Sequence, residues 1–359
     1  MSKTNRIESC PDCLLPTRRE VIKAAAGSVA AASLASAGIF SFSVTPRAMA
    51  AEAAQKAAPE TLVAQLFKSL TDAQRQVIAF PFDHKLRSEV NNNWMIVDKA
   101  ISSILTKDQL ALVREIFLDI HSDEYAQKVL GQVEHDNSEV GGFGGCSIAL
   151  FGEPGNIGVD PINAGKNSKF EFVFAGRHVT RRCDGNSVDG AAFGGPIFYG
   201  HAAESFNEKA NHPGNVYWYQ AVRANEVFKA LDGKQRKLAL LDTDPRKEQA
   251  TKTVALSGKI EGLPGIALAD LSGDQKELVQ KVMTDLLAPF RKEDADEAMK
   301  LIAAGGMDNL HMSFYSKLDI GKDGVWDVWQ IEGPSMLWYF RGAPHVHTWV
   351  NIREPAARA

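Results

Sequence analysis

Apolar residues recur at three- and four-residue steps along several stretches of this chain. In residues 107–119, for example, Leu110, Val113, Ile116 and Phe117 fall on one face of a helix. The same spacing predicts further helices over 59–70, 72–79, 122–132, 217–230, 233–241, 273–288 and 293–303. Residues 58–132 are therefore expected to be mainly helical, and helices return after residue 216.

A second pattern marks where four of these helices begin. A leucine, a capping residue and, three positions later, a glutamine recur in Leu70–Gln74, Leu105–Gln109, Leu231–Gln235 and Leu271–Gln275. In such a capping box the Thr, Ser or Asp side chain accepts a hydrogen bond from a free backbone N–H, and the glutamine side chain accepts one from the backbone N–H of the capping residue. Capping accounts for the whole spacing, so we interpret the pattern as structural rather than as a repeated ligand-binding motif.

Residues 309–352 change to short aromatic and β-branched segments. Strands are predicted over Met312–Leu318, Val325–Ile331, Ser335–Arg341 and His345–Ile352, separated by short turns rich in Gly and Pro. Such turns join antiparallel neighbours, because a parallel pair needs a crossover of about a dozen residues or more. Earlier strands are predicted at 146–151 and 169–182. The fold class expected is α+β, one domain with helices packed on a C-terminal antiparallel sheet.

The first fifty residues have the order of an export signal. Thr17–Lys23 contains the adjacent pair Arg18-Arg19, residues 24–45 are mostly Ala, Ser and Gly, and Ala48-Met49-Ala50 is a small-x-small cleavage pattern. The arginine pair resembles the twin-arginine type, which exports folded proteins, so we expect the twin-arginine export machinery as a partner and a periplasmic or otherwise exported location. The alternative is an uncleaved membrane anchor. Its segment would hold few of the large apolar side chains that a span needs.

Cleavage after Ala50 would leave residues 51–359. The leader holds six of the 40 basic and three of the 44 acidic residues, which leaves 34 basic and 41 acidic residues and a formal charge of −7. Nucleic acid is not expected as a partner, because its phosphates require clustered Lys and Arg. No second long apolar run follows, so no stable membrane span is expected after cleavage.

The four cysteines divide between the leader and the body. Cys10 and Cys13 have the CxxC spacing of zinc and redox sites but lie before the arginine pair, so they would leave with the signal. Cys146 and Cys183 remain in the body. An exported protein allows a disulfide between them, and two buried free thiols are the equally ordinary outcome.

The strongest candidate for chemistry is the pair His345 and His347. On the predicted last strand both side chains point to one face together with Trp349, while Val346 and Thr348 point to the other. Two imidazoles at this spacing form a common half of a metal site, and neutral imidazole suits zinc, copper and iron. Surface or hydrogen-bonded core histidines have the same spacing, so a third ligand is needed.

His178 is the best candidate for that third ligand, because residues 169–180 are predicted to form a strand of the same sheet. His201, after an aromatic and glycine-rich loop, and Glu332, before a Gly-Pro turn, are possible additional ligands. His212 is expected in a solvated turn. The remaining histidines, which show no local pattern, are expected to be structural: His84, His121, His135 and His311.

Charged residues near these strands suggest a substrate site. Arg177, Arg181, Arg182 and Arg341 flank the histidine strands and could clamp an anionic group, although ion pairs at the surface would use them equally well. The chain contains no Gly-x-Ser-x-Gly elbow, no HExxH helix and no phosphate-binding GxxxxGK[ST] loop. Several common enzyme classes are thereby excluded.

Four passages of the chain resemble the bacterial domain-of-unknown-function family 3500. They are Phe80–Asp83 with Arg87 and Trp94, Phe151–Pro154 leading to Gly176–His178, Pro196–Gly200 leading to Leu231–Gln235, and Ile331–Pro334 leading to His345–Thr348. The resemblance implies that His178, His345 and His347 are family-type positions. Arg177-His178 stands where the family usually has two adjacent histidines, so a four-histidine site is in doubt.

We therefore expect an exported metal-binding protein, a metalloenzyme of unresolved reaction, with one zinc, copper or iron ion on His178, His345 and His347. Arg177 or Arg182 would orient an anionic small-molecule ligand, and Asp83, Arg87 and Trp94 would line the approach. Two alternatives stay open. One is a metal-free binding or structural protein of the cell envelope, and the other is a metal-independent hydrolase in which histidine acts as base with Asp184 or Glu332 as its partner.

Overall fold

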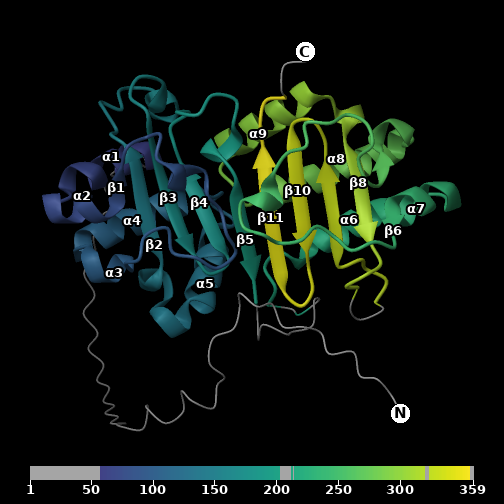
Figure 1. Ribbon diagram of the computed structural model, residues 1–359, viewed down its shortest axis with the longest axis horizontal. Helices are drawn as coiled ribbons and strands as arrows, with labels where there is room; N and C mark the ends of the chain where they lie inside the picture. Colours follow the sequence, from purple (N-terminus) through teal and green to yellow (C-terminus); the bar gives the residue numbers. More distant parts are fainter. Residues whose placement is uncertain (1–56, 203–211, 213, 320–322, 356–359) are drawn as a thin grey trace, which may run out of the picture. The chain divides into compact units, whose positions relative to one another are not determined.

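Eleven strands form a single, mostly antiparallel sheet in the order β1-β2-β3-β4-β5-β11-β10-β9-β8-β6, with β7 paired to β8 (Figure 1). The computed structural model describes residues 57–202, 212, 214–319 and 323–355, and residues 58–359 form one compact unit. The strands are β1 (Ala79–Phe80), β2 (Ser147–Gly152), β3 (Phe170–Gly176), β4 (Val179–Cys183), β5 (Ile197–His201), β6 (Leu240–Leu241), β7 (Ile266–Ala267), β8 (His311–Tyr315), β9 (Val328–Glu332), β10 (Met336–Arg341) and β11 (Val346–Ile352).

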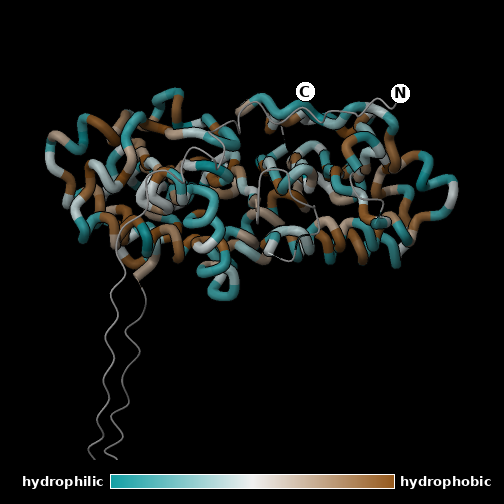
Figure 2. Tube along the Cα trace, turned by 90° about the horizontal axis from the view of Figure 1, so that it is seen from below, coloured by the Kyte–Doolittle hydropathy of each residue, from teal (hydrophilic) through white to brown (hydrophobic). Residues whose placement is uncertain are grey.

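The helices pack against this sheet, which confirms the α+β class. They are α1 (Pro59–Ser69), α2 (Asp72–Ile78), α3 (Ile101–Ile104), α4 (Lys107–Asp119), α5 (Ala126–Asp136), α6 (Trp218–Ala230), α7 (Gly233–Ala239), α8 (Gly273–Leu287) and α9 (Lys292–Gly305). Their apolar sides and one face of the sheet share a large core that includes Val113, Phe174 and Trp338. Apolar and polar segments alternate along the coloured part of the trace in Figure 2, as expected for elements that bury one side.

The order of the elements occurs twice. Each half begins with a helix pair, α1–α2 or α6–α7, which leads into the two-residue strand β1 or β6. Each half then contains two longer helices, α4–α5 or α8–α9, and ends with four strands, β2–β5 or β8–β11. β1 pairs parallel with β2, and β6 pairs parallel with β8. The order and direction of the strand pairs are therefore the same counted from either edge of the sheet, apart from β7. The halves meet where β5 and β11 pair antiparallel at the centre.

The four capping boxes are present and join in pairs, one pair in each half. Gln74 and Gln109 exchange amide hydrogen bonds at 2.8 and 3.1 Å, and Gln235 and Gln275 do so at 3.0 and 2.8 Å. Each amide therefore caps its own helix and bonds to the start of another. The recurrence in the sequence thus reflects a duplicated helix pairing.

Irregular chain covers the second face of the sheet around β11. Val90 and Val254 pack there with Phe198 and Trp349, in a core cluster separate from the larger one. On β11, Val346 and Val350 belong instead to the helix-side core. This confirms the alternation predicted for the last strand, with Trp349 and the His347 side chain on the face without helices.

The structure differs from the sequence-based expectation in one element that matters for the site. The single strand predicted over 169–182 is wrong, because the chain reverses at Arg177-His178 and forms the hairpin β3–β4. Cys146 and Cys183 are free, buried thiols, and burial raises the pKa of each. No helix in the described residues is long and apolar enough to cross a bilayer. The arginine pair, the cleavage pattern and Cys10–Cys13 lie outside those residues.

Candidate metal centre

His345 and His347 are placed by the hairpin that joins β10 to β11. His347 lies on β11 opposite Gly200 of β5, and His345 directly precedes the strand. Both side chains are fully buried. Glycine is required at position 200, because a Cβ there would clash with the Val346 carbonyl oxygen.

His178 reaches the pair from the turn of the β3–β4 hairpin. Its φ of 58° is in the left-handed region, which costs a non-glycine residue roughly 1 kcal/mol. Neighbouring groups hold this backbone in place: the His178 N–H donates to the Asn92 carbonyl at 2.8 Å, and the His178 carbonyl accepts from Gly200 at 3.1 Å. The Asn137 amide bonds both backbone groups of Arg177. A strained residue fixed this firmly is typical of functional positions.

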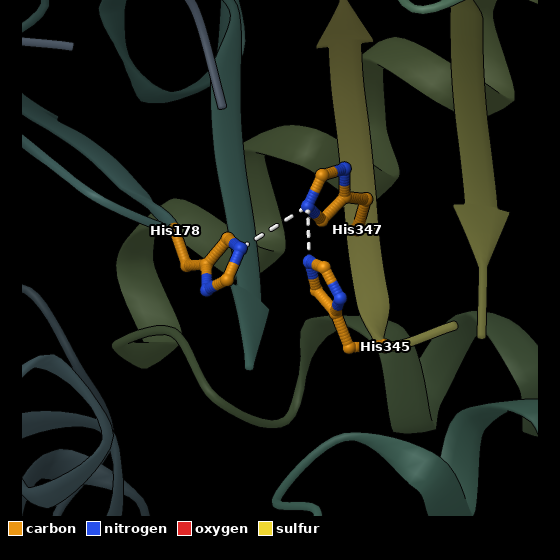
Figure 3. Close-up of side chains that lie close together, drawn as sticks. All are labelled: His178, His345 and His347. Carbon is orange, nitrogen blue, oxygen red and sulfur yellow. Dashed lines mark hydrogen bonds between the residues drawn. The ribbon is translucent and has the colours of Figure 1, made fainter. Parts of the chain in front are cut away.

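The three rings converge through their Nε2 atoms (Figure 3). His347 Nε2 lies 2.9 Å from His345 Nε2 and 3.1 Å from His178 Nε2. Around a tetrahedral ion with metal–nitrogen bonds of about 2.0–2.1 Å, ligand nitrogens stand roughly 3.3 Å apart. The two distances to His347 Nε2 are within a few tenths of an ångström of this value, and all three ligand atoms lie within 4.8 Å of one another, so the three buried histidines could hold an ion.

A carboxylate holds the other nitrogen of His178. Asp136 Oδ2, at the end of α5, lies 3.0 Å from His178 Nδ1 and accepts from Gln132 Nε2 at 2.7 Å. Burial on its own would raise the pKa of Asp136, but the charge of His178 and hydrogen bonds from His178 and His201 hold that pKa well below its usual value. Asp136 is therefore an anion that only accepts, and His178 must donate from Nδ1.

Glu248, in the irregular segment on this face, contacts Nδ1 of His347 as Asp136 contacts Nδ1 of His178. Its Oε2 lies 2.5 Å from His347 Nδ1, and its Oε1 accepts from Arg341 Nε at 2.5 Å. Burial, with the charges of Arg341 and His178, lowers the pKa of His347 well below 6.5. His347 is thus a neutral imidazole whose Nδ1 contacts both Glu248 Oε2 and Arg341 Nη2, and it donates to Glu248 when the proton is on Nδ1.

Asp136 fixes the proton of His178 on Nδ1, and Glu248 favours the same tautomer in His347. When both rings are neutral and carry their proton on Nδ1, the Nε2 lone pairs of His178 and His347 face each other at 3.1 Å. Two acceptors at this distance repel unless a cation or a proton lies between them. Carboxylate–histidine pairs of this kind orient ligands around protein-bound metals. The donor chemistry therefore fits a metal ion.

Comparison with known proteins gives a family but no function. A sequence profile described as "Protein of unknown function (DUF3500)" matches residues 52–356. The chain belongs to this family. No curated protein and no solved structure matches. The matched region of this DUF3500 protein contains all of the converging groups, namely Asp136, His178, Glu248, His345 and His347.

His201 and Glu332, named above as possible additional ligands, do not belong to the group of three converging rings, and Glu332 lies opposite Leu337 at the far end of β10 from Arg341. His201 Nδ1 is 3.5 Å from Asp136 Oδ2, and its Nε2 contacts the Gly214 carbonyl at 3.1 Å. Glu332 pairs with Arg246 at 2.9 Å. Asp184 accepts from backbone N–H groups of its own loop, so the carboxylates that contact the cluster are Asp136 and Glu248.

The other predicted residues divide between two places. Arg177 stands near the cluster, with Nη1 3.4 Å from the Asp136 carbonyl. Arg182 and Arg87 both pair with buried Glu171, at 2.5 and 3.0 Å, and Trp94 donates to Thr180 at 3.0 Å. These last residues tie irregular chain to the sheet. Asp83 is exposed.

Asp136 and Glu248 were missed by the sequence analysis. Asp136 lies beyond the predicted end of the helix at residue 132, because α5 runs from 126 to 136. Glu248 lies in chain with neither helical nor strand periodicity. Arg341, also near His347, was named only as a strand-flanking cation. A carboxylate that acts through contacts 42 or 99 residues away has no local signature.

Proposed function

We propose that this protein is an exported metalloprotein that holds one transition-metal ion on His178, His345 and His347. The observation that carries the proposal is the convergence of three buried Nε2 atoms. In two of the three rings, Nδ1 contacts a carboxylate. Zinc, copper and iron all accept three imidazole nitrogens. Such binding would also remove the repulsion between the facing lone pairs.

The number of ligands supports an enzymatic role. Three protein ligands leave a coordination position open, which is typical of catalytic rather than structural sites, and a bound ion would supply Lewis-acid or redox chemistry there. The chain's own groups would hold the tautomers, through Asp136 and Glu248, and keep bulk water out. All three rings are completely buried, so this arrangement favours a small substrate over a polymer.

The leader supports loading before export. The twin-arginine pattern at Thr17–Lys23 and the small residues Ala48-Met49-Ala50 would direct a folded protein to the periplasm. A metal bound during folding in the cytoplasm would travel with the chain. Fractionation of cells that express the wild type and an Arg18→Lys/Arg19→Lys variant tests this, because the variant should accumulate uncleaved in the cytoplasm.

Elemental analysis of the purified mature protein tests the metal proposal. We expect about one equivalent of a single transition metal per chain in the wild type and less than about a tenth in His347→Ala. The matched control is His135→Ala, which removes an exposed histidine next to Asp136.

Two results would contradict the metal proposal. The first is a wild-type protein that is folded, as judged by cooperative unfolding, and takes up none of zinc, copper or iron. The second is a His347→Ala variant that keeps its metal. A His135→Ala variant with reduced metal would indicate instead that the fold around α5, and not the ligand set, controls the metal content.

A further inference from the structure

A pocket of about 230 Å³ opens on the same sheet face, at the other end of the β5–β11 pair. Arg87 and Arg353 line it, together with Gly194, Gly195, Thr251 and Asn351. None of its lining residues is acidic. The histidine cluster does not contribute to it, so the metal proposal leaves this pocket without a role.

The pocket carries more positive than negative charge. Arg353 is exposed, and within the described residues its side chain has no ion pair or hydrogen bond. Arg87 shares the single carboxylate of Glu171 with Arg182. Of the nearby acids, Glu89 accepts from Thr251 at 2.6 Å. Asp184, behind Gly194, has its pKa raised by burial to about 8 and is mostly protonated at neutral pH.

The duplicated fold relates this pocket to the metal centre. In the first half the carbonyl of the turn residue His178 accepts from Gly200, and in the second half the carbonyl of the turn residue Ser335 accepts from Arg353. Gly200 and Arg353 are therefore equivalent positions on β5 and β11. Counting six residues back from each gives Gly194 and His347.

The pocket thus stands where the symmetry-related metal centre would be, with its ligands replaced. By this count Gly194, in the segment before β5, corresponds to His347, and Ser335, which lies outside the pocket lining, corresponds to His178. The equivalent of Asp136 at the helix end is Gly305, which packs directly on Ser335. Without imidazoles the space stays open. The ligand type also changes, because guanidinium groups bind anions and not metal cations.

We propose that this pocket binds a small oxyanion, a carboxylate or phosphate group, between Arg87 and Arg353. Planar guanidinium forks match both groups through paired hydrogen bonds. Asn351 adds a second contact, since its Oδ1 is buried without a hydrogen-bond partner and would accept from a hydroxyl or water on the ligand. The volume limits the ligand to a small molecule.

Calorimetric titration of the mature protein with inorganic phosphate and with acetate tests this inference, at an ionic strength held constant with chloride. We expect saturable binding of at least one of them with a millimolar or lower Kd, and the preferred one identifies the group. Arg353→Gln should weaken binding about tenfold, which is roughly 1.4 kcal/mol. Lys229→Gln, the same charge change on the exposed side of α6, should leave it unchanged.

The inference is overturned if neither anion binds, or if Arg353→Gln binds both as tightly as the wild type. The titration is repeated on protein stripped of metal by a chelator. Anion binding that persists supports the pocket whatever becomes of the metal proposal. Binding that disappears with the metal would place the anion on the ion instead and would overturn the inference.

Discussion

Asp136→Asn is the substitution that tests the tautomer argument most sharply. Asp136 Oδ2 faces three donors, His178 Nδ1 at 3.0 Å, Gln132 Nε2 at 2.7 Å and His201 Nδ1 at 3.5 Å. Asparagine has nearly the same shape but no charge and only one acceptor oxygen. The change therefore leaves the packing in place and alters only what holds the His178 ring.

Either orientation of the new amide weakens metal binding. If its oxygen keeps the position of Oδ2, its NH₂ group meets the Ala202 N–H, which now donates to Oδ1 at 3.3 Å. If the amide turns over, NH₂ faces His178 Nδ1 and favours the tautomer with a proton on Nε2, which cannot coordinate. Loss of such a supporting carboxylate typically costs 10- to 100-fold in metal affinity, about 1.4–2.7 kcal/mol.

Competition with a chromophoric chelator measures that loss as a ratio of Kd values for zinc. The control is Glu139→Gln, which removes an exposed carboxylate paired with Arg177 at 3.7 Å, three residues after Asp136. The control should match the wild type. An Asp136→Asn protein that folds normally and binds zinc within about twofold of wild type would refute the tautomer reasoning.

Three further outcomes are expected. His178→Gly should abolish metal binding and also lower the free energy of unfolding of the metal-free protein, because the loss of the buried partner of Asp136 outweighs the relief of the left-handed backbone; chemical denaturation of both forms checks it. Gln109→Ala and Gln275→Ala should each lower the free energy of unfolding by about 1–2 kcal/mol, with similar losses in the two halves, as urea melts would show. Burial and then the charge of Arg181 lower the pKa of His121 to about 3 in the native state against 6.5 in the unfolded chain, so only the unfolded chain takes up its proton between these values. The wild type should therefore lose up to about 1.4 kcal/mol per pH unit below pH 6.5, and His121→Gln should lose less over the same range.

Much of the fold is visible in local patterns. The capping boxes define helix starts without long-range information, and period-two alternation places His347 and Trp349 on one face of β11. Helix ends were less well defined, since α5 begins at 126 rather than 122. Such patterns depend on short-range interactions, so the elements predicted from them are present in the structure with small shifts in their ends.

The hairpin at Arg177-His178 could not be predicted in the same way. Turns that need a left-handed residue usually contain Gly or Asn at that position. Here a histidine adopts a φ of 58°, and hydrogen bonds from the turn to Asn92, Asn137 and Gly200 hold it there. Those partners lie far away in the sequence. Local sequence patterns therefore predict one continuous strand through the turn, although the sequence also groups His178 with His345 and His347, which it contacts in the structure.

The duplication was hidden because the halves retain their topology and caps but not their side chains. Gly194 and Ser335 differ in residue type from His347 and His178, to which they correspond when positions are counted from the matching Gly200 and Arg353 contacts. The three histidines come from both halves, His178 from the first and His345 and His347 from the second. The candidate metal centre thus depends on the β5–β11 junction that joins them.

Anomalous X-ray scattering from crystals of the metal-loaded protein, recorded at the absorption edge of its metal, would locate the ion itself. One strong peak is expected within about 2.0–2.2 Å of the Nε2 atoms of His178, His345 and His347. Metal-loaded crystals with the peak elsewhere, and no density between these three rings, would contradict it.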